Sequence, residues 1–222
     1  MSAARPPRPG LGTRWQELEV KFFLLHPDPL HERLKASQAT CVRPRELEVN
    51  LRYDTPERDL TRGQRVLRLR RDRQARLTYK EAGRAEGALK TRVEVEFDVS
   101  DADAAQELLE CLGYECLLRY EKYREEWKLG KARFMLDVLP FGSFLEIEGP
   151  SEAGLKEAAR RLGLEWSQAF QGSYLSIFAY LREAYSLSFR DLTFSNFKDL
   201  PQFDLGLPES AWHPLTGGEH ER

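Results

Sequence analysis

Apolar and polar residues alternate at every second position in several short stretches of the chain. The first stretch is Glu17-Leu18-Glu19-Val20-Lys21, in which charged residues are separated by aliphatic ones. Successive side chains of a β-strand point to opposite faces, so a strand here would place both acids and the lysine on one face. Taken alone, this pentapeptide is typical of an edge strand whose charged face meets water.

The same alternation recurs along the chain and predicts eight strands, with helices between them. The third and fourth strands would form a hairpin, because a polar turn at residues 72–74 separates them. A loop is expected at residues 81–90. The predicted strands are residues 15–23, 48–53, 66–71, 75–80, 91–97, 119–127, 132–139 and 143–148, and the predicted helices are residues 30–36, 100–112, 151–162 and 173–185.

Each predicted strand has one aliphatic face and one charged face. Helices need an apolar surface to pack on, so we expect the aliphatic faces to point outward beneath helices and the charged faces to point inward. The predicted fold is therefore α+β, a closed or nearly closed antiparallel eight-stranded β-barrel with helices packed outside, wide enough for side chains and one small ligand. The alternative is an ordinary antiparallel sheet with its charged face in water and weak cross-strand pairs.

A barrel of this kind would enclose seven acidic and seven basic side chains. Burying them for stability alone is implausible, since removing each charge from water costs several kcal/mol. A wet cavity is the better interpretation, in which carboxylates hold Mg²⁺ or Mn²⁺ and cationic groups hold phosphates. The inward set is Glu17, Glu19, Glu94, Glu96, Asp137, Glu146 and Glu148, with Lys21, Arg68, Arg70, Lys80, Arg92, Lys122 and Arg124.

Composition narrows the class of protein. The chain has 222 residues, 32% of them charged, and a formal net charge of −2, so it is long enough for one substantial domain and lacks the basic excess of a general nucleic-acid or membrane-surface binder. Cys41, Cys111 and Cys116 are odd in number and lack metal-site spacing, which predicts reduced thiols in a cytoplasmic protein. No apolar run has the length of a signal peptide or membrane span.

Three segments are expected. Residues 1–13 are rich in proline and glycine and predict a disordered leader. Residues 14–185 form the predicted tunnel domain. Residues 186–222 lose clear periodicity and predict a C-terminal extension that is mobile after residue 200.

The ordered string of charged motifs resembles the CYTH family, also called triphosphate tunnel metalloenzymes. This family groups class IV adenylyl cyclases with thiamine triphosphatases and inorganic triphosphatases, and the resemblance covers about residues 15–185. Residues 111–114, 142–148 and 172–174 look most like the class IV adenylyl cyclase branch. The motifs that carry the resemblance are Glu17-x-Glu19-x-Lys21, Arg68-x-Arg70, Lys80, Arg92-x-Glu94-x-Glu96, Lys122-x-Arg124, Asp137 and Glu146-x-Glu148.

The resemblance implies a role for each of these residues. Lys21 would act as a catalytic base or as a phosphate ligand. Arg68, Arg70, Lys80, Arg92, Lys122 and Arg124 would bind the triphosphate. Mg²⁺ or Mn²⁺ would be held by Glu17, Glu19, Asp137, Glu146 and Glu148, with Glu94 and Glu96 assisting.

Departures from the family pattern argue against assigning the chain to one branch of the family. Arg52 stands where the mammalian thiamine triphosphatase has a tyrosine, and Asn50 stands where the family has an aspartate. Ser173-Tyr174 lies near the point where a C-terminal helix often brings a lysine to the tunnel. The first two differences disfavour a thiamine triphosphatase, and the third leaves open how this end of the tunnel is closed.

Hydrolysis of inorganic triphosphate or of a nucleoside triphosphate is the expected activity, because it needs only the predicted phosphate and metal groups. The alternative is a class IV adenylyl cyclase that converts ATP to cyclic AMP and pyrophosphate, which also needs an adenine pocket. A non-catalytic polyphosphate or nucleotide sensor is disfavoured, since its acids would repel the ligand without a cation. The partner is then a small triphosphate-containing molecule, not nucleic acid or membrane, and a homodimer is left open.

Overall fold

The computed structural model describes residues 13–16, 18–86, 89–91, 93–170, 172–200 and 203. The predicted leader up to residue 12 lies outside the described residues, as do Glu17, Arg92 and all but one residue beyond 200. No helix in the described part of the chain combines the length and the apolar character needed to cross a membrane.

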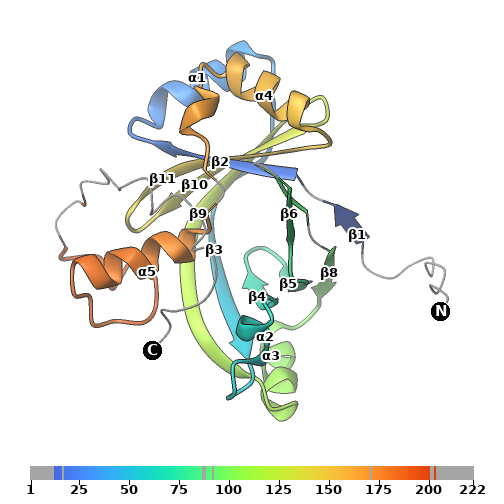
Figure 1. The fold of residues 1–222 in the computed structure, drawn as a ribbon, viewed down its shortest axis with the longest axis vertical. Coiled ribbons are helices and arrows are strands. Elements are labelled where there is room, and N and C mark those ends of the chain that lie inside the picture. Colours follow the sequence, from blue (N-terminus) through green and yellow to red (C-terminus); the bar gives the residue numbers. More distant parts are fainter. Residues whose placement is uncertain are drawn as a thin grey trace.

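One antiparallel sheet forms the body of the molecule (Figure 1). Its strand order is β1-β8-β5-β4-β3-β9-β10-β11-β2, and its two outermost strands are consecutive in the chain, separated only by residue 17. The sheet is thus a nearly closed barrel, which confirms the predicted fold. The strands are β1 (Thr13–Gln16), β2 (Leu18–Leu24), β3 (Thr40–Asp54), β4 (Val66–Arg71), β5 (Ala75–Lys80), β8 (Val93–Val99), β9 (Glu115–Leu129), β10 (Ala132–Leu139) and β11 (Gly142–Gly149).

The strand predictions were most accurate where alternation is unbroken. The strands β4, β5 and β10 begin and end at the predicted residues, and the predicted first strand is observed as β1 and β2. The strand β3 begins eight residues earlier than expected, because register shifts between Cys41 and Glu46 interrupt its alternation. The prediction of a loop at residues 81–90 was wrong, since this segment contributes to a small hairpin of β6 (Arg84–Glu86) and β7 (Leu89–Thr91).

Two helices cover one side of the barrel, α1 (Asp28–Ala36) and α4 (Glu152–Arg161) (Figure 1). Their apolar side chains, among them Leu34 and Leu155, share one buried cluster with Phe22, Phe134 and Ile147 from the strands beneath. Ser151 caps α4, its hydroxyl accepting a hydrogen bond from the Gly154 amide. The aliphatic faces of β2, β10 and β11 therefore point outward against helices, as expected.

The remaining helices complete the outer layer. The short α2 (Asp59–Arg62) and α3 (Ala102–Cys111) cover the strands β3 to β5 through a cluster that includes Tyr53, Leu69 and Leu109. After a 3₁₀ turn at Trp166–Gln168, α5 (Tyr174–Ala184) packs over a third, aromatic cluster.

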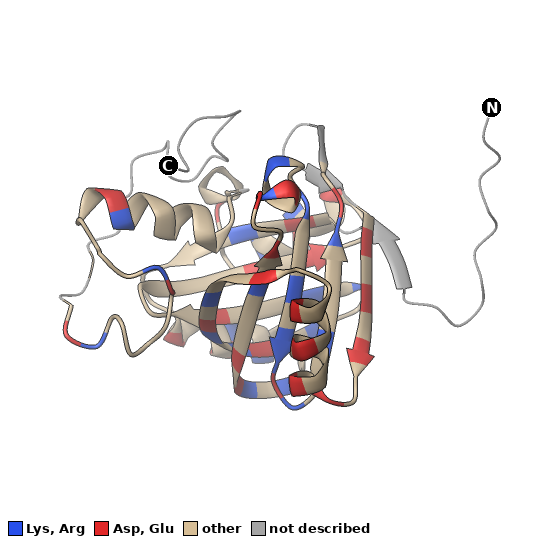
Figure 2. Ribbon diagram, turned by 90° about the horizontal axis from the view of Figure 1, so that it is seen from below, with Lys and Arg blue, Asp and Glu red and all other residues tan. Residues whose placement is uncertain are grey.

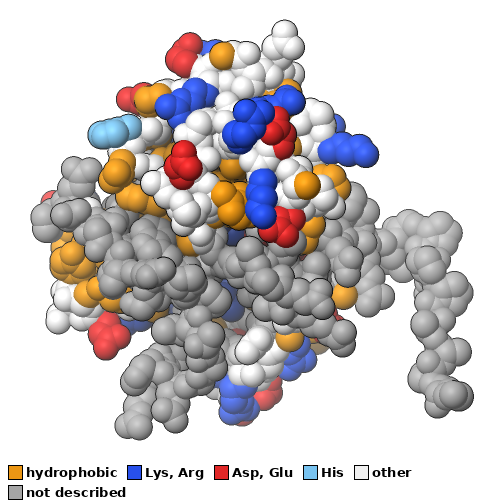
Figure 3. Space-filling model, turned by 45° about the horizontal axis from the view of Figure 1, so that its top comes forward, with side chains coloured by type: hydrophobic (Ala, Val, Ile, Leu, Met, Phe, Trp, Pro, Cys, Tyr) orange, Lys and Arg blue, Asp and Glu red, His pale blue; other side chains and the backbone are white. Residues whose placement is uncertain are grey.

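Charged side chains divide between two environments. Over α1 and α4 the outer surface carries interspersed acids and bases (Figure 3), including the exposed pairs Lys35–Glu32 and Lys156–Glu152. Such exposed pairs contribute little to stability. Along the strands, bands of both charge signs recur between uncharged positions (Figure 2), and the inward members of this pattern build the site described next.

Candidate functional site

The inner faces of the strands enclose a cavity of about 960 Å³. Among the described residues, its lining has eleven cationic and seven acidic side chains, an excess of four cations. The acids are Glu19, Glu94, Glu96, Asp98, Glu126, Glu146 and Glu148. The cations are Lys21, Arg43, Arg52, Arg68, Arg70, Arg76, Lys80, Lys122, Arg124, Lys131 and Arg133.

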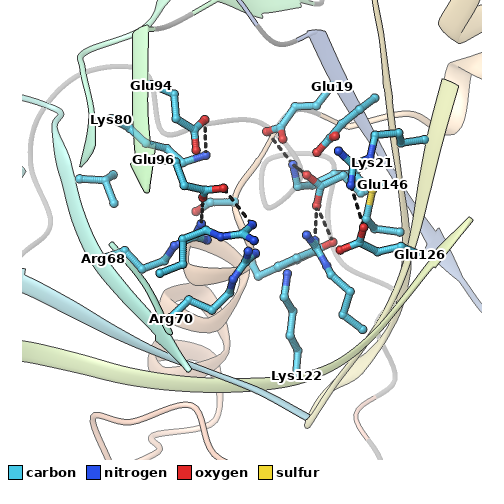
Figure 4. A pocket seen from close by; sticks show the side chains of 18 of the residues that line it. Glu19, Lys21, Arg68, Arg70, Lys80, Glu94, Glu96, Lys122, Glu126 and Glu146 are labelled. Atoms are coloured by element: carbon cyan, nitrogen blue, oxygen red, sulfur yellow. Dashed lines mark hydrogen bonds and ion pairs between the residues drawn. The ribbon is translucent and has the colours of Figure 1, made fainter. Parts of the chain in front are cut away.

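A cluster of carboxylates lies on the wall formed by β2 and β11. Strand register places Glu19 opposite Glu148 and Lys21 opposite Glu146, so these side chains share the inner face. One carboxylate oxygen from each of Glu19, Glu146 and Glu148 lies within 4.8 Å of the others. Lys21 Nζ lies 2.7 Å from Glu19 Oε1 and 3.7 Å from Glu146 Oε1, so the cluster already holds a positive charge (Figure 4).

The donor set of this cluster fits a divalent cation. Hard oxygen ligands suit Mg²⁺ and Mn²⁺, and Mg²⁺ usually binds through few carboxylates while keeping several waters. Burial alone would raise the pKa of Glu146, but the charges of Lys21 and Arg124 outweigh it and hold that pKa well below its ordinary value. Glu146 is therefore ionised near neutral pH, as a metal ligand must be.

Asp137 lies in the wall of the tunnel, fully buried beneath the cavity. Its Oδ1 and Oδ2 each accept a hydrogen bond from Arg124 at 2.6 Å, and Oδ2 also accepts one from Lys122 at 3.1 Å and one from the Tyr174 hydroxyl at 2.9 Å. Burial and the negative charge of Asp137 raise the pKa of Tyr174 well above its ordinary value, so the phenol stays protonated and donates. Among the described acids, Asp137 does not join the carboxylate cluster.

The opposite wall is basic. The strands β4 and β5 contribute Arg68, Arg70, Arg76 and Lys80, and predicted assisting acids on β8 lie among them (Figure 4). Lys80 Nζ is 2.8 Å from Glu94 Oε2. The carboxylate of Glu96 contacts Arg76 Nη1 at 3.0 Å and the Thr78 hydroxyl at 2.8 Å.

These contacts give Glu94 and Glu96 different surroundings from the cluster of Glu19, Glu146 and Glu148. Burial would raise the pKa of Glu96, but the hydrogen bond from Thr78 and the charge of Arg70 lower it below its ordinary value. Glu96 therefore stays ionised, and each of the two acids orients a cation of the basic wall. Their assistance to a metal stays a prediction.

Sequence reasoning missed Glu48, which lies between the two walls with only 2% of its surface exposed. Its carboxylate is 3.5 Å from both Arg70 Nη1 and Lys122 Nζ, and it accepts a hydrogen bond from Asn50 at 3.0 Å. Burial would raise its pKa, but the charges of Lys122 and Arg124 lower it far below the ordinary value. The available signal was its alternation with Asn50 and Arg52 on the polar face of β3.

Tyr120 was also missed, because it is an isolated aromatic residue on an irregular strand. Its buried hydroxyl accepts a hydrogen bond from Arg68 Nη1 at 3.4 Å. Burial would raise the pKa of this phenol, but the charges of Arg68 and Lys122 lower it below the ordinary value. Tyr120 thus lines the cavity between two predicted phosphate ligands.

Twelve of the predicted site residues belong to the described part of the chain. Eleven line the cavity, and Asp137 lies immediately behind it. Glu17 and Arg92, predicted to bind metal and triphosphate respectively, lie outside the described residues.

Residues 16–174 match the model of the CYTH domain, and the chain therefore belongs to the CYTH family. Members of this family bind triphosphate substrates and depend on metal ions. No curated protein sequence matches the chain significantly.

Solved structures show the same fold. A putative adenylate cyclase from Vibrio parahaemolyticus has a TM-score of 0.64 and 24% identity over 75% of this chain and 99% of its own. A Pyrococcus horikoshii protein has a TM-score of 0.63 and 28% identity over 75% of this chain and 99% of its own. A putative adenylyl cyclase from Hippeastrum, described as having dominant triphosphatase activity, has a TM-score of 0.57 and 20% identity over 74% of this chain and 95% of its own.

Proposed function

We propose that this protein is a divalent-metal-dependent triphosphatase that hydrolyses inorganic triphosphate or a nucleoside triphosphate in its tunnel. The observation that carries the proposal is the separation of charge inside one cavity. Glu19, Glu146 and Glu148 gather on one wall, whereas the other walls present an excess of guanidinium and ammonium groups. A polyanion bound together with a divalent cation matches both walls at once.

In the proposed complex the cations bind and orient the phosphates. Arg68 and Arg70 project from β4, and Lys122 and Arg124 from β9, so a linear polyphosphate between these strands meets donors on both sides. Guanidinium groups suit this task because their planar fork donates to two oxygens at once. Glu48, Glu96 and Asp137 hold these cations in place before the substrate arrives, through Arg70 and Lys122, Arg68, and Lys122 and Arg124 respectively.

Glu19, Glu146 and Glu148 would hold Mg²⁺ or Mn²⁺, which supplies charge neutralisation and makes a bound water more acidic. Lys21 lies beside this cluster. As an ammonium it donates a hydrogen bond to a phosphate oxygen, and as a neutral amine it would accept a proton from the attacking water. The tunnel thereby provides most of what phosphoryl transfer asks of a protein, positioning and electrostatic stabilisation.

Adenylyl cyclase activity would additionally require a surface that holds adenine and orients the ribose hydroxyl. The described lining is mostly charged, and the hydroxyls of its two tyrosines, Tyr120 and Tyr174, already form hydrogen bonds with Arg68 and Asp137. This composition favours hydrolysis over cyclisation.

One experiment tests the proposal. Purified protein is incubated with Mg²⁺ or Mn²⁺ and either inorganic tripolyphosphate or ATP, and the products are identified by ³¹P NMR and chromatography. We expect metal-dependent release of phosphate that EDTA abolishes. Cyclic AMP as the main product would replace the proposal with a cyclase. Tight tripolyphosphate binding without turnover would replace it with a sensor.

A further inference from the structure

The chain returns to the tunnel wall after α5. The family model ends at residue 174, so the segment beyond α5 lies outside the residues that match it. Leu192 forms a parallel bridge with Tyr120 of β9 and is completely buried. The Leu192 amide donates to Arg119 O at 2.9 Å, and the Glu121 amide donates to Leu192 O at 2.9 Å.

This bridge fills a specific gap in the sheet. The strand β10 pairs with β9 only from Tyr123 onward, so the neighbouring part of β9 has an edge that β10 does not cover. An uncovered edge exposes backbone donors and acceptors, and Leu192 satisfies them. Two side chains strengthen the junction, because Asp191 accepts a hydrogen bond from the Arg119 amide at 3.1 Å and Glu121 accepts one from the Phe194 amide at 3.1 Å.

The fastened part of β9 carries tunnel residues. Side chains alternate along a strand, so Tyr120 and Lys122 point into the cavity while Glu121, between them, points outward to the C-terminal segment. The backbone that sets the position of two cavity side chains is thus held from behind by this segment.

A second series of contacts connects the C-terminal segment to the tunnel through aromatic rings. Phe197 contacts Phe141, with ring centroids 6.3 Å apart, Phe141 contacts Phe144 at 5.7 Å, and Phe144 contacts Tyr174 at 4.9 Å. The Tyr174 hydroxyl then donates to Asp137, which holds both Lys122 and Arg124. Phe197 is buried and also packs against Phe178 of α5, at 5.9 Å.

We propose that residues 189–197, the C-terminal strap, position the triphosphate-binding side chains of this tunnel. The strap fixes Tyr120 and Lys122 through the backbone of β9, and it fixes Tyr174 and Asp137 through the ring contacts that begin at Phe197. The inference rests on the proposed function for its activity measurement, although its binding and exchange measurements do not.

The test compares Phe197→Ala and the milder Phe197→Leu with Tyr185→Ala as a control, since Tyr185 is half exposed and lies outside the strap. We expect Phe197→Ala to lower kcat for tripolyphosphate about tenfold, because small displacements of positioning groups are costly. Phe197→Leu should fall between Phe197→Ala and wild type, and Tyr185→Ala should match wild type.

A double-mutant cycle with Tyr174→Phe separates positioning from general loss of stability. If the strap acts through Tyr174, Phe197→Ala has a much smaller effect on kcat once the Tyr174 hydroxyl is gone. If the effects of the two substitutions on kcat simply multiply, the proposed path of ring contacts from Phe197 to Tyr174 is wrong. Equal losses of kcat in Phe197→Ala and Tyr185→Ala would also contradict it.

Two further measurements remain informative even if wild-type protein hydrolyses nothing. Calorimetry should show weaker tripolyphosphate binding by Phe197→Ala than by Tyr185→Ala. Hydrogen exchange should show faster exchange at the amides of Glu121 and Leu192 in Phe197→Ala. Unchanged binding together with unchanged exchange at these amides would overturn the strap, whereas absent hydrolysis by wild type alone would overturn only the triphosphatase proposal.

Discussion

The ammonium of Lys21 forms an ion pair at 2.7 Å with Glu19, two residues earlier on the same inner face of β2. The predicted catalytic residue and a predicted metal ligand are therefore direct neighbours, and the cation of one neutralises the carboxylate of the other. A divalent ion that binds Glu19 would compete with this pair. Binding of metal would thereby release Lys21 toward the substrate.

Replacing Lys21 tests its role. We expect Lys21→Met to reduce tripolyphosphate hydrolysis about 100-fold, since it removes both a phosphate donor and a base. Lys21→Arg should restore the KM for tripolyphosphate without restoring kcat if the base role is correct, and should restore both if Lys21 is only a phosphate ligand. Steady-state kinetics measure the difference, with the exposed Lys156→Met as control. Normal turnover in Lys21→Met would refute both roles.

Replacing Glu146 tests the metal cluster. Glu146→Gln keeps the size of the side chain but removes the charge that a divalent cation requires, so we expect hydrolysis to fall about 100-fold and Mn²⁺ affinity to fall with it. Isothermal titration of Mn²⁺ and a phosphate-release assay measure the two effects. The surface variant Glu157→Gln serves as the control. Unchanged Mn²⁺ affinity in Glu146→Gln would place the metal elsewhere.

Asp137 provides a test that separates its predicted metal role from its observed contacts. In Asp137→Asn, Arg124 and Lys122 lose a buried partner, and we expect the free energy of unfolding to fall by about 3–5 kcal/mol. The KM for tripolyphosphate should rise, because both cations lose their fixed positions. Mn²⁺ affinity should stay close to that of wild type. A loss of Mn²⁺ affinity as large as that in Glu146→Gln would support a metal ligand instead.

Stability should depend on pH through Glu48. Its pKa in the folded protein is far below the ordinary value of about 4.3 in an unfolded chain. The contribution of Glu48 to the free energy of unfolding is therefore complete above about pH 4.3 and is lost as the pH falls toward the folded-state pKa. The slope approaches about 1.4 kcal/mol per pH unit for this one carboxyl.

Urea unfolding between pH 7 and pH 3 measures this dependence. Glu48→Gln should be less stable than wild type at pH 7, since Lys122 and Arg70 lose a negative partner. It should also lose less stability on acidification than wild type does. Parallel pH profiles for the two proteins would contradict the assignment.

The local alternation of apolar and polar residues is enough to predict much of the fold. In β10 the alternation of Phe134 and Leu136 with Met135 and Asp137 assigned each side chain to its face, because the side-chain period of a strand is a local property. The same alternation predicts that Lys21, Arg68 and Glu146 point into a tunnel. Alternation also puts Glu48 on the polar face of β3 with Asn50 and Arg52, but it does not show that this face lies between Arg70 and Lys122.

Tertiary structure decided which of these charges meet. Alternation cannot tell Glu19 from Glu94, since both lie on inner faces, yet strand register brings Glu19 to Glu146 and Glu94 to Lys80. Register depends on packing and turns across the whole sheet, which no single strand encodes. The segment around Leu192 has no strand periodicity of its own. Its position is set by backbone groups of β9 that β10 leaves unpaired, and these are known only from the tertiary structure.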